Sequence, residues 1–382
     1  MTPALPVRAT RQDLHLEPDR TRVVARLFVA GQEVVGGSEG RATGVVQRLL
    51  DLDEDEVQAG VDDLMTRFRG RHRDLVSTFS HHADRISNRL DPGMELTEER
   101  WLLLGAAFTH EYAVEGASLC NPSIVAHPSQ ADAPLGGLRV VLSVRGIGEG
   151  HLSTIGFRSG SVTYEGALEL DAPEPHPVLG TIDPGVLDRA AFHGHLRAAG
   201  GDGESAAFVL DELGPTFTSE ELDLRLAHLA GQRDTRRNAR STADAIRAIA
   251  ARSYATHFPV DTDLSERVLW PATAAESRGM EDARFVRFVD TDGSVAYLAT
   301  YTAFDGTDVS QQLLRTDDFV RFESSSVSGP AARGKGLALF PRRIGGRFAA
   351  LSRHDRERNS VAFSDSLDHW GTSAVVQVPR RG

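Results

Sequence analysis

The sequence has little of several features that would point to particular classes of protein. Its one cysteine, Cys120, excludes an internal disulfide and a multi-cysteine metal site, and we expect a buried structural thiol there. No apolar run is long enough to span a bilayer, and the N-terminal stretch MTPALPVRATRQDLHLEPDR contains no apolar signal core. Basic residues are in deficit, with 42 Lys and Arg against 54 Asp and Glu, whereas nucleic-acid binding favours a basic face. The sequence therefore predicts a cytoplasmic protein that binds neither nucleic acid nor membrane.

The first hundred residues of the 382 carry apolar side chains at helical spacing. The segment DLDEDEV interrupts this pattern and predicts a helix break with an N-cap. We expect an N-terminal helical region over residues 1–100 and a mainly β domain over 101–382. The apolar positions that define the helices are Val45, Val46, Leu49 and Leu50, followed by Val57, Val61 and Leu64.

A histidine-rich stretch, RHRD followed by SHHAD, invites a metal-site interpretation. His81 and His82 are adjacent, however, so they point about 100° apart on a helix. No pair of histidines four residues apart accompanies a carboxylate there, as a helical zinc site requires. The stretch instead predicts a solvated helix face, and no metal site is expected.

Strand patterns begin near Trp101. Three β-rich segments are separated by Gly or Ser turns, and two hairpins are predicted around TDG and IGG. A polar, helix-like insertion occupies about 183–257 between these strand groups. The β-rich segments are RVVLSVR (139–145), HLSTIGFR (151–158) and VTYEGALEL (162–170).

A weak internal repeat indicates the architecture. LLRTDDFVRF (313–322) and VAFSDSLDHW (361–370) align without gaps, and IGFRSGSVTY (155–164) is a fainter third copy. The first two copies are 48 residues apart, close to the roughly 40–50 residues of a four-stranded propeller blade. A β-sandwich would also give short strands with regular turns, but it would not explain the repeated strand–turn–aromatic unit. The repeat favours a β-propeller.

Four polar segments fall just before or within candidate inner strands, where a propeller would bring them to its central funnel. They are CNPSIV, VRGIGEGH, GMEDARF and the run from RGKGLALF to LSR. In ESRGMEDARF, Glu281 and Asp282 lie between Arg278 and Arg284. These charges form either a salt bridge at the start of a strand or a site for acid–base chemistry. The residues alone favour the salt bridge.

Three of these segments resemble glycoside hydrolase family 130, the β-mannoside phosphorylases and β-mannosidases. The matching stretches are NPSIV, MEDARF and KGLALFPRRIGGRFAALSR, and the resemblance runs from about Leu103 to the end of the chain. It implies a five-bladed β-propeller and an enzyme that cleaves β-mannosidic bonds with inversion. The N-terminal helices and the stretch HEYAVEGASLCNPSIVAHPSQ are similar to a longer-chained branch of that family.

The resemblance also implies roles for individual residues. Asp282 matches the family's catalytic aspartate, Asn121 and Arg145 match its sugar contacts, and Lys335 and Arg353 match its phosphate contacts. Further candidates for substrate binding are Glu149, His151, Glu281, Arg284 and Asp305.

The implied chemistry needs no cofactor. Inorganic phosphate is the co-substrate and nucleophile, so mannose 1-phosphate is released and a second catalytic carboxylate is unnecessary. Arg353 would bind the phosphate bidentately and Lys335 as a point charge. The family's aspartate is proposed to protonate the leaving oxygen through a sugar hydroxyl. Alternatives are a phosphate-independent β-mannosidase and a propeller that binds a carbohydrate or protein without catalysis.

Strand alternation makes a geometric prediction. Glu281 and Asp282 should point to opposite faces, and Arg284 should share the face of Asp282 and favour its anionic form. The family's proline after the aspartate is Ala283 in this sequence.

The sequence stops at VVQVPRRG, after about three blades and the start of a fourth, which predicts an incomplete propeller with an exposed strand edge. We expect the apolar stripes of both helical regions to pack against the propeller or against a second subunit in a homo-oligomer.

Overall fold

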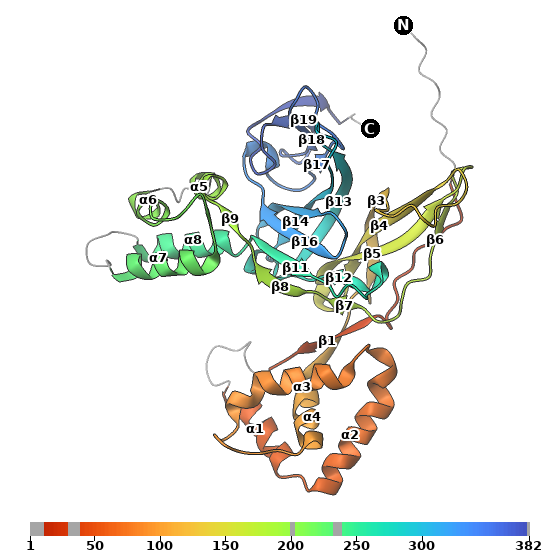
Figure 1. The fold of residues 1–382 in the computed structure, drawn as a ribbon, viewed down its shortest axis with the longest axis vertical. Helices are drawn as coiled ribbons and strands as arrows, with labels where there is room; N and C mark the ends of the chain where they lie inside the picture. Colours follow the sequence, from red (N-terminus) through yellow and green to blue (C-terminus); the bar gives the residue numbers. More distant parts are fainter. Residues whose placement is uncertain (1–10, 30–38, 199–202, 232–238, 380–382) are drawn as a thin grey trace.

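The computed structural model describes residues 11–29, 39–198, 203–231 and 239–379. The fold is mainly β, with one group of helices before the strands and a second group inserted between them (Figure 1). No described helix is both long and apolar enough to cross a membrane.

The N-terminal helices form a lobe with its own apolar cores. Asp53 caps α2 and exchanges hydrogen bonds with Glu56 in a capping box, as the DLDEDEV segment predicts. Phe79 and Leu104 are among the buried residues of the two clusters between these helices. The helices are α1 (Glu39–Leu50), α2 (Glu54–Phe68), α3 (Leu75–Ile86) and α4 (Glu98–Ala107).

Two features of this region differ from the sequence prediction. A strand, β1 (Val23–Leu27), precedes the helices and pairs antiparallel with β2 (Thr109–Ala113). The histidine-rich stretch is only partly solvated, because His82 is buried and donates from Nδ1 to Thr109 Oγ1 at 2.7 Å. His72 is also covered and pairs with Glu111 at 2.7 Å.

The β region contains three antiparallel meanders, each of four consecutive strands. Both predicted hairpins are present, as β13–β14 and β17–β18. The first meander is β3 (Ser118–Ala126), β4 (Leu138–Ile147), β5 (Ser153–Val162) and β6 (Leu168–Leu170). The second is β13 (Gly279–Val289), β14 (Val295–Phe304), β15 (Val309–Thr316) and β16 (Arg321–Ser326). The third is β17 (Ala338–Leu339), β18 (Phe348–Ser352), β19 (Asn359–Ser364) and β20 (Thr372–Gln377).

The internal repeat corresponds to the last two strands of each meander. The two better copies cover the β15–β16 and β19–β20 turns, and the faint copy begins in β5 and leads toward β6. The aromatic residues that close the better copies, Phe322 and Trp370, are both fully buried. The repeat therefore exists because each meander buries an aromatic side chain at the same turn.

Short strands and an aromatic core join the meanders. In that core Phe157 lies between Phe285, Phe319 and Phe322 at ring-centroid distances of 5.5–5.9 Å. The short strands are β7 (Val178–Leu179), β8 (Thr181–Pro184), β11 (Tyr254–His257) and β12 (Arg267–Leu269), where β12 pairs with β5 and β7 while β11 pairs with β8 and β16.

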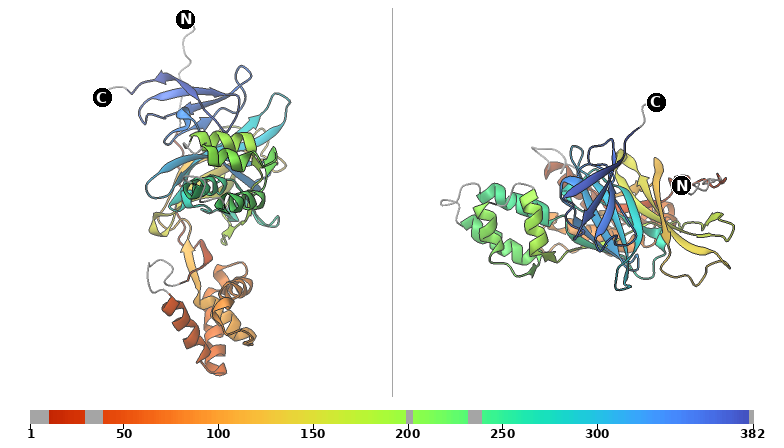
Figure 2. Two further views of the ribbon diagram at one scale, coloured as in Figure 1. Left: turned by 90° about the vertical axis from the view of Figure 1, so that its left-hand side faces the viewer. Right: turned by 90° about the horizontal axis from the view of Figure 1, so that it is seen from above.

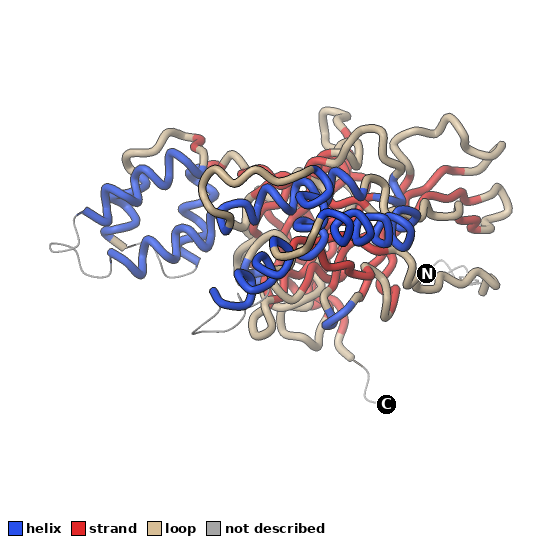
Figure 3. The backbone as a smooth tube through the Cα atoms, turned by 90° about the horizontal axis from the view of Figure 1, so that it is seen from below, coloured by secondary structure: helices blue, strands red, loops and turns tan. Residues whose placement is uncertain are grey.

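The helical insertion is a second lobe that lies apart from the N-terminal helices in Figure 1 and in the left view of Figure 2. Figure 3 shows its helices to one side of the strands. Its apolar stripe of Leu222, Leu226 and Leu229 lies in a cluster built only from residues 187–250. It contains α5 (Arg189–Ala198), α6 (Glu204–Leu210), α7 (Ser219–Gly231) and α8 (Ala239–Ala250), preceded by β9 (Leu187–Asp188), which pairs with β10 (Thr216–Phe217).

The expected packing of the helical stripes against the strands is therefore wrong. Each helical lobe buries its own apolar stripe. Val57 and Val61 are buried in the N-terminal lobe, and Leu226 is buried in the insertion. β20 keeps exposed apolar residues, with Val375 45% and Val376 59% exposed. Among the described residues, no strand pairs with the outer edge of β20.

Candidate functional site

The candidate catalytic residue Asp282 lies at a bulge in β13. Glu281 pairs with Thr302 and Arg284 pairs with Thr300, so residues 282 and 283 lie opposite the single residue Tyr301, which makes this a β-bulge with one extra residue in β13. Asp282 adopts a left-handed backbone with φ 58°. The prediction that Glu281 and Asp282 point to opposite faces is wrong, because the bulge breaks the strand alternation and both carboxylates reach the same guanidinium.

A second bulge faces the first. Asn121 in β3 has φ 50°, and the register of β3 against β4 shifts between Cys120 and Ser123. Asparagine tolerates this conformation better than most residues, and a bulge accepts the following Pro122, which has no backbone donor. The amide of Asn121 donates to Oδ1 of Asp282.

Arg145 of β4 joins the two carboxylates. Its Nη1 donates to Asp282 Oδ1 at 3.0 Å, and its Nη2 donates to Glu281 Oε1 at 2.7 Å. Its Nε donates to Ser153 Oγ at 2.9 Å, which fixes the plane of the guanidinium. The side chains of Arg145 and Asp282 are 18% and 20% exposed, so the pair lies at a surface that a ligand can reach.

The approach of β13 to β5 requires glycine at position 279. Gly279 has φ 144° and pairs with Ser153, and a Cβ atom there would lie 2.7–2.8 Å from atoms of that serine. Because Ser153 also holds Arg145, this close contact sets the distance between the guanidinium and the carboxylates.

The segment between η6 (Pro330–Ala332) and β17 brings Lys335 to the same cluster. Lys335 Nζ contacts Glu281 Oε2 and lies 5.6 Å from the ring centroid of Phe304. Gly334 and Gly336 on either side have positive φ of 73° and 96°. Lys335 is also the only lysine in the sequence, a signal that motif reading did not use.

Arg353 and Arg284 complete the cationic side of the cluster. A Cβ atom on Gly336 would lie 3.7 Å from Arg284 Nη1 and 3.7 Å from Arg353 Cβ, so this glycine lies between the two arginines. Arg353 Nη2 donates to the carbonyl of Arg356 at 3.3 Å. Among the described residues, Glu281 and Asp282 are ion-paired with Arg145 and Lys335 and not with these two arginines. Arg284 and Arg353 therefore add positive charge beside the cluster, which suits an anionic ligand.

Three further predicted residues likewise have no hydrogen bond or ion pair with Glu281, Asp282 or their partners among the described residues. Glu149 lies beyond the end of β4, where its carboxylate is 3.5 Å from His110 Nε2. His151 is exposed on the same turn with φ 59°. Asp305 follows β14 and accepts from the backbone of Thr307 and Asp308 at 2.8 and 2.7 Å, so it stabilises its own turn.

Sequence reasoning missed a buried carboxylate that supports the site segment. Glu276 accepts hydrogen bonds from the hydroxyls of Tyr254 and Tyr301 and from the backbone amides of Ala272 and Thr273. Burial, together with the charge of Glu276, raises the pKa of both tyrosines, so they remain hydroxyl donors. The signal was present in ESRGMEDARF, whose first letter is Glu276.

Cys120 lies next to the cluster as the register partner of Arg145, but its chemistry is unfavourable for catalysis. Burial is the largest effect on this thiol and raises its pKa, with the neighbouring carboxylates acting in the same direction. A protonated thiol is a weak nucleophile. Cys120 is only partly buried, however, so the prediction of a buried thiol is wrong in that respect.

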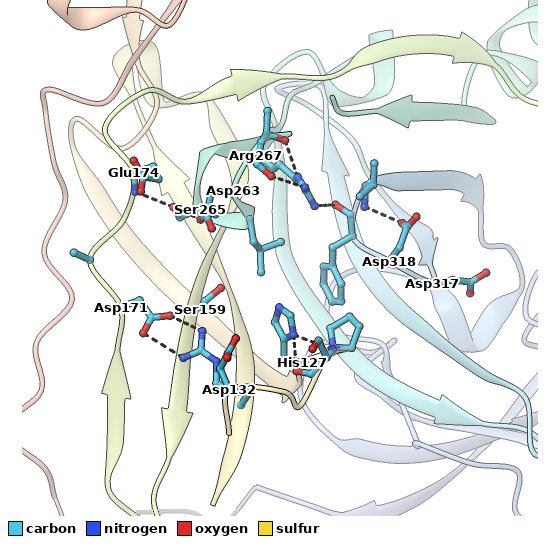
Figure 4. A pocket seen from close by; sticks show the side chains of 18 residues that line it. His127, Asp132, Ser159, Asp171, Glu174, Asp263, Ser265, Arg267, Asp317 and Asp318 are labelled. Carbon is cyan, nitrogen blue, oxygen red and sulfur yellow. Dashed lines mark hydrogen bonds and ion pairs between the residues drawn. The ribbon is translucent and has the colours of Figure 1, made fainter. Parts of the chain in front are cut away.

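A separate cavity of about 600 Å³ lies toward the opposite ends of these strands (Figure 4). Three of its six carboxylates serve the fold: Asp171 pairs with Arg139 at 2.6 Å, and Asp263 and Asp318 cap backbone turns. Among the residues that the structure describes, no group of three His, Cys, Asp or Glu side chains could hold a metal ion. This cavity is not part of the candidate site.

No family model and no curated protein matches the chain. Among solved structures it is similar to glycoside hydrolases and mannoside phosphorylases. A putative glycoside hydrolase from Bacteroides ovatus is 13% identical with a TM-score of 0.35, over 71% of this chain and 56% of that one. A second structure comes from the GH130 family of mannoside phosphorylases, which contains glycoside hydrolases that target β-1,2 mannosidic linkages in Candida mannan. It is 13% identical with a TM-score of 0.33, over 71% of this chain and 55% of that one.

A β-1,2-mannobiose phosphorylase from Listeria innocua is 16% identical with a TM-score of 0.28, over 69% and 62% of the two chains. The chain thus spans little more than half the length of these neighbours. The descriptions of two of these neighbours name mannoside phosphorylases, as in the family that the motifs resemble, but likenesses at this identity and TM-score establish neither fold nor activity. The function proposed next rests on the residues of the site.

Proposed function

We propose that the chain cleaves β-mannosidic bonds with inversion, by phosphorolysis to mannose 1-phosphate. One observation carries the proposal: Asn121, Arg145 and Lys335, from three separate segments, converge on the adjacent carboxylates of Glu281 and Asp282. A salt-bridged strand entrance would not need two left-handed bulge residues facing each other.

Asp282 is the proposed general acid. Asn121 and Arg145 both donate to its Oδ1, and no described residue donates to its Oδ2. Oδ2 is therefore available to a sugar hydroxyl. In the reaction, the proton on Oδ2 passes to this hydroxyl, the hydroxyl proton passes to the glycosidic oxygen, and the C1–O bond breaks. The leaving sugar departs as an alcohol and Asp282 remains as a carboxylate.

Glu281 is the proposed anchor of the cations rather than a second catalytic carboxylate. Its side chain is 7% exposed and is paired with both Arg145 and Lys335. A carboxylate held in this way has no free edge to activate water, which favours phosphate over water as the nucleophile.

Phosphate would bind where Lys335, Arg353 and Arg284 gather around Gly336. A dianion there would attack C1 from the face opposite the leaving oxygen and form the new C1–O bond. Its negative charge would also favour the protonated form of Asp282, which Arg145 otherwise holds as an anion. Binding of phosphate would thus prepare the acid as well as supply the nucleophile.

The remaining architecture is part of the same proposal. The three meanders would be blades of a five-bladed propeller with the candidate site at its funnel, in a domain covering 101–382. The substrate would be a β-mannoside oligosaccharide in the cytoplasm, with Glu149, His151 and Asp305 contacting sugar units beyond the cleaved bond. A homo-oligomer would cover the exposed face of β20.

The test is incubation of the protein with β-1,2-mannobiose, β-1,4-mannobiose and β-mannosyl-glucose, each with and without phosphate. The expected result is mannose 1-phosphate formed only when phosphate is present. Free mannose formed at the same rate without phosphate would instead identify a hydrolase. No turnover of any β-mannoside by folded protein would contradict both activities.

A further inference from the structure

A second cavity, of about 460 Å³, lies between the helical insertion and the second meander. The strands that contribute to it are β15 and β16, and Figure 1 draws the insertion on the side of the second meander. The insertion contributes His195 from α5, and Ile249 and Arg252 from the end of α8. The strands and the segment before β17 contribute Ser310, Gln311 and the residues 326–330 and 332–334, and the turn before β20 contributes His369. None of the residues around Asp282 lines it.

The cavity has a positive lining in a strongly acidic chain. Arg252, Arg333, His195 and His369 line it, and it has no Asp or Glu in its lining. The chain as a whole carries a formal charge of −12, and the cavity of about 600 Å³ is lined by six carboxylates. A larger cavity of about 880 Å³ also has a basic lining, with Arg26, Arg85, His81 and His82, but none of its described lining residues has an unpartnered buried polar atom. Such a concentration of basic groups without carboxylates favours an anionic ligand.

Unpartnered polar atoms gather around this cavity. Six buried side-chain N or O atoms of the described residues lack a hydrogen bond, and one of these, Arg22 Nε, is ion-paired with Glu115. Three others line the cavity, and a fourth, Gln312 Oε1, belongs to the register partner of Ser326. The three lining atoms are His195 Nε2, Arg252 Nε and Ser326 Oγ. Buried polar groups are normally satisfied, so this cluster indicates a missing partner.

The kinds of atom define the ligand. Arg252 Nε is a donor and requires an acceptor such as a phosphate oxygen, whereas a serine hydroxyl such as Ser326 Oγ can both donate and accept. Ser326 is only 6% exposed and can pair with either a phosphate oxygen or a hydroxyl. Burial lowers the pKa of His195, although the charge of Asp368 opposes this effect. The neutral ring can pair with a hydroxyl.

We propose that this cavity binds a sugar phosphate, with the phosphate on Arg252 and Arg333 and the sugar hydroxyls toward Ser326 and His195. Its volume is that of a site for a small ligand. The proposal does not depend on the catalytic function proposed above.

One contact connects the cavity to the candidate catalytic site. Gln311 Nε2 donates to the carbonyl of Gly334 at 2.8 Å, and Lys335 follows directly in the chain. A ligand that orders Arg333 and Gly334 would therefore also order the residue that contacts Glu281.

The test is titration calorimetry with mannose 6-phosphate, mannose 1-phosphate, inorganic phosphate and mannose. The protein carries Lys335→Ala, Arg353→Ala and Arg284→Ala, which remove the three cations proposed to hold phosphate in the catalytic site. We expect a sugar phosphate to bind in this background and Arg252→Gln to weaken it at least about tenfold, the loss of one charge-assisted hydrogen bond. Ser326→Ala should also weaken binding without lowering the melting temperature of the free protein, because its hydroxyl has no partner to lose.

Arg247→Gln is the matched control, since Arg247 is on α8 but half-exposed and paired with Asp223 and Asp244. It should leave the affinity unchanged. Three results would overturn the proposal: no binding of any sugar phosphate, equal weakening by Arg247→Gln, or equal affinity for inorganic phosphate and sugar phosphate. Because the background lacks the catalytic phosphate contacts, each of these results is independent of whether the protein is a phosphorylase.

Discussion

Asn121 and Asp282 face each other from two bulged strands, both with left-handed backbone, at φ 50° and 58°. The amide of Asn121 donates to the carboxylate of Asp282 although the two residues are 161 positions apart in the sequence. Neither residue is a glycine, so both conformations cost free energy that regular strands would not. Backbone strain of this kind concentrates at functional sites, which supports a binding or catalytic role for the pair.

Substitutions at Asn121 should separate strain from function. Asn121→Ala removes the hydrogen bond and leaves a residue that tolerates φ 50° poorly, so stability should fall by about 1 kcal/mol and turnover should fall too. Asn121→Gly also removes the hydrogen bond but relieves the strain, so it should recover stability without recovering turnover. Urea denaturation and mannose 1-phosphate formation measure the two effects. Full turnover in Asn121→Gly would mean that the side chain only shapes the bulge.

Arg145 should contribute to both stability and activity. Arg145→Met leaves Glu281 with only Lys335 as a cationic partner, so we expect a loss of about 2 kcal/mol in the free energy of unfolding. Arg145→Lys keeps one charge but cannot contact both carboxylates and Ser153 in a plane, so it should retain most of the stability and lose turnover.

Arg139 supplies the matched control for Arg145, because it lies on the same strand and pairs with the half-exposed Asp171. Arg139→Met should cost less than about 1 kcal/mol and leave turnover unchanged. Equal effects of Arg139→Met and Arg145→Met would argue that the guanidinium at position 145 has no special role.

The single lysine offers a chemical test of the phosphate site. Acetylation of Lys335 removes its charge and should raise the KM for phosphate about tenfold or more, whereas reductive methylation keeps the charge and should change it less. Phosphate should protect Lys335 from acetylation, as measured by mass spectrometry of its peptide. Labelling that is indifferent to phosphate would exclude Lys335 from the phosphate site. Because its side chain is 47% exposed, its loss should have little effect on stability.

The N-terminal lobe should lose stability in mild acid because of His82. Burial lowers the pKa of His82 from 6.5 to about 4, with the charges of His81, Arg85 and Arg26 acting in the same direction. The folded lobe therefore binds fewer protons at this position than the unfolded chain. Its contribution is complete above pH 6.5 and is lost as the pH falls toward 4, by about 1–2 kcal/mol.

His82→Gln should flatten this dependence on pH, whereas His81→Gln, at the exposed neighbouring position, should retain it. Chemical denaturation at several pH values between 4 and 7 measures both variants. A dependence on pH that survives in His82→Gln would assign it to other groups.

Much of the fold could be predicted because each meander repeats a local pattern. Alternating apolar residues and the buried aromatic residues Phe322 and Trp370 mark the strands and turns directly in the sequence. The packing of the helical lobes could not be predicted in the same way. An amphipathic stripe such as Leu222, Leu226 and Leu229 predicts that a face is buried but does not identify the surface that buries it.

The candidate site was predictable in its residues but not in its geometry. Charged residues within apolar strands identified Arg145, Glu281 and Asp282, since such charges need partners. Strand alternation then predicted the wrong faces for Glu281 and Asp282, because no local sequence pattern indicates the bulge after Glu281. The supporting roles of Ser153 and Glu276 depend on contacts between distant segments, which a single sequence does not contain.

The central claim is that Asp282 directs inverting phosphorolysis, and the anomeric form of the product tests it most directly. Phosphorus and proton NMR during turnover of a β-mannoside in phosphate should show α-mannose 1-phosphate as the first product. Asp282→Asn should reduce its formation at least about a hundredfold with little change in melting temperature. Asp292→Asn, in the turn of the same hairpin, should leave the rate unchanged. Formation of the β anomer, or undiminished turnover in Asp282→Asn, would contradict the account.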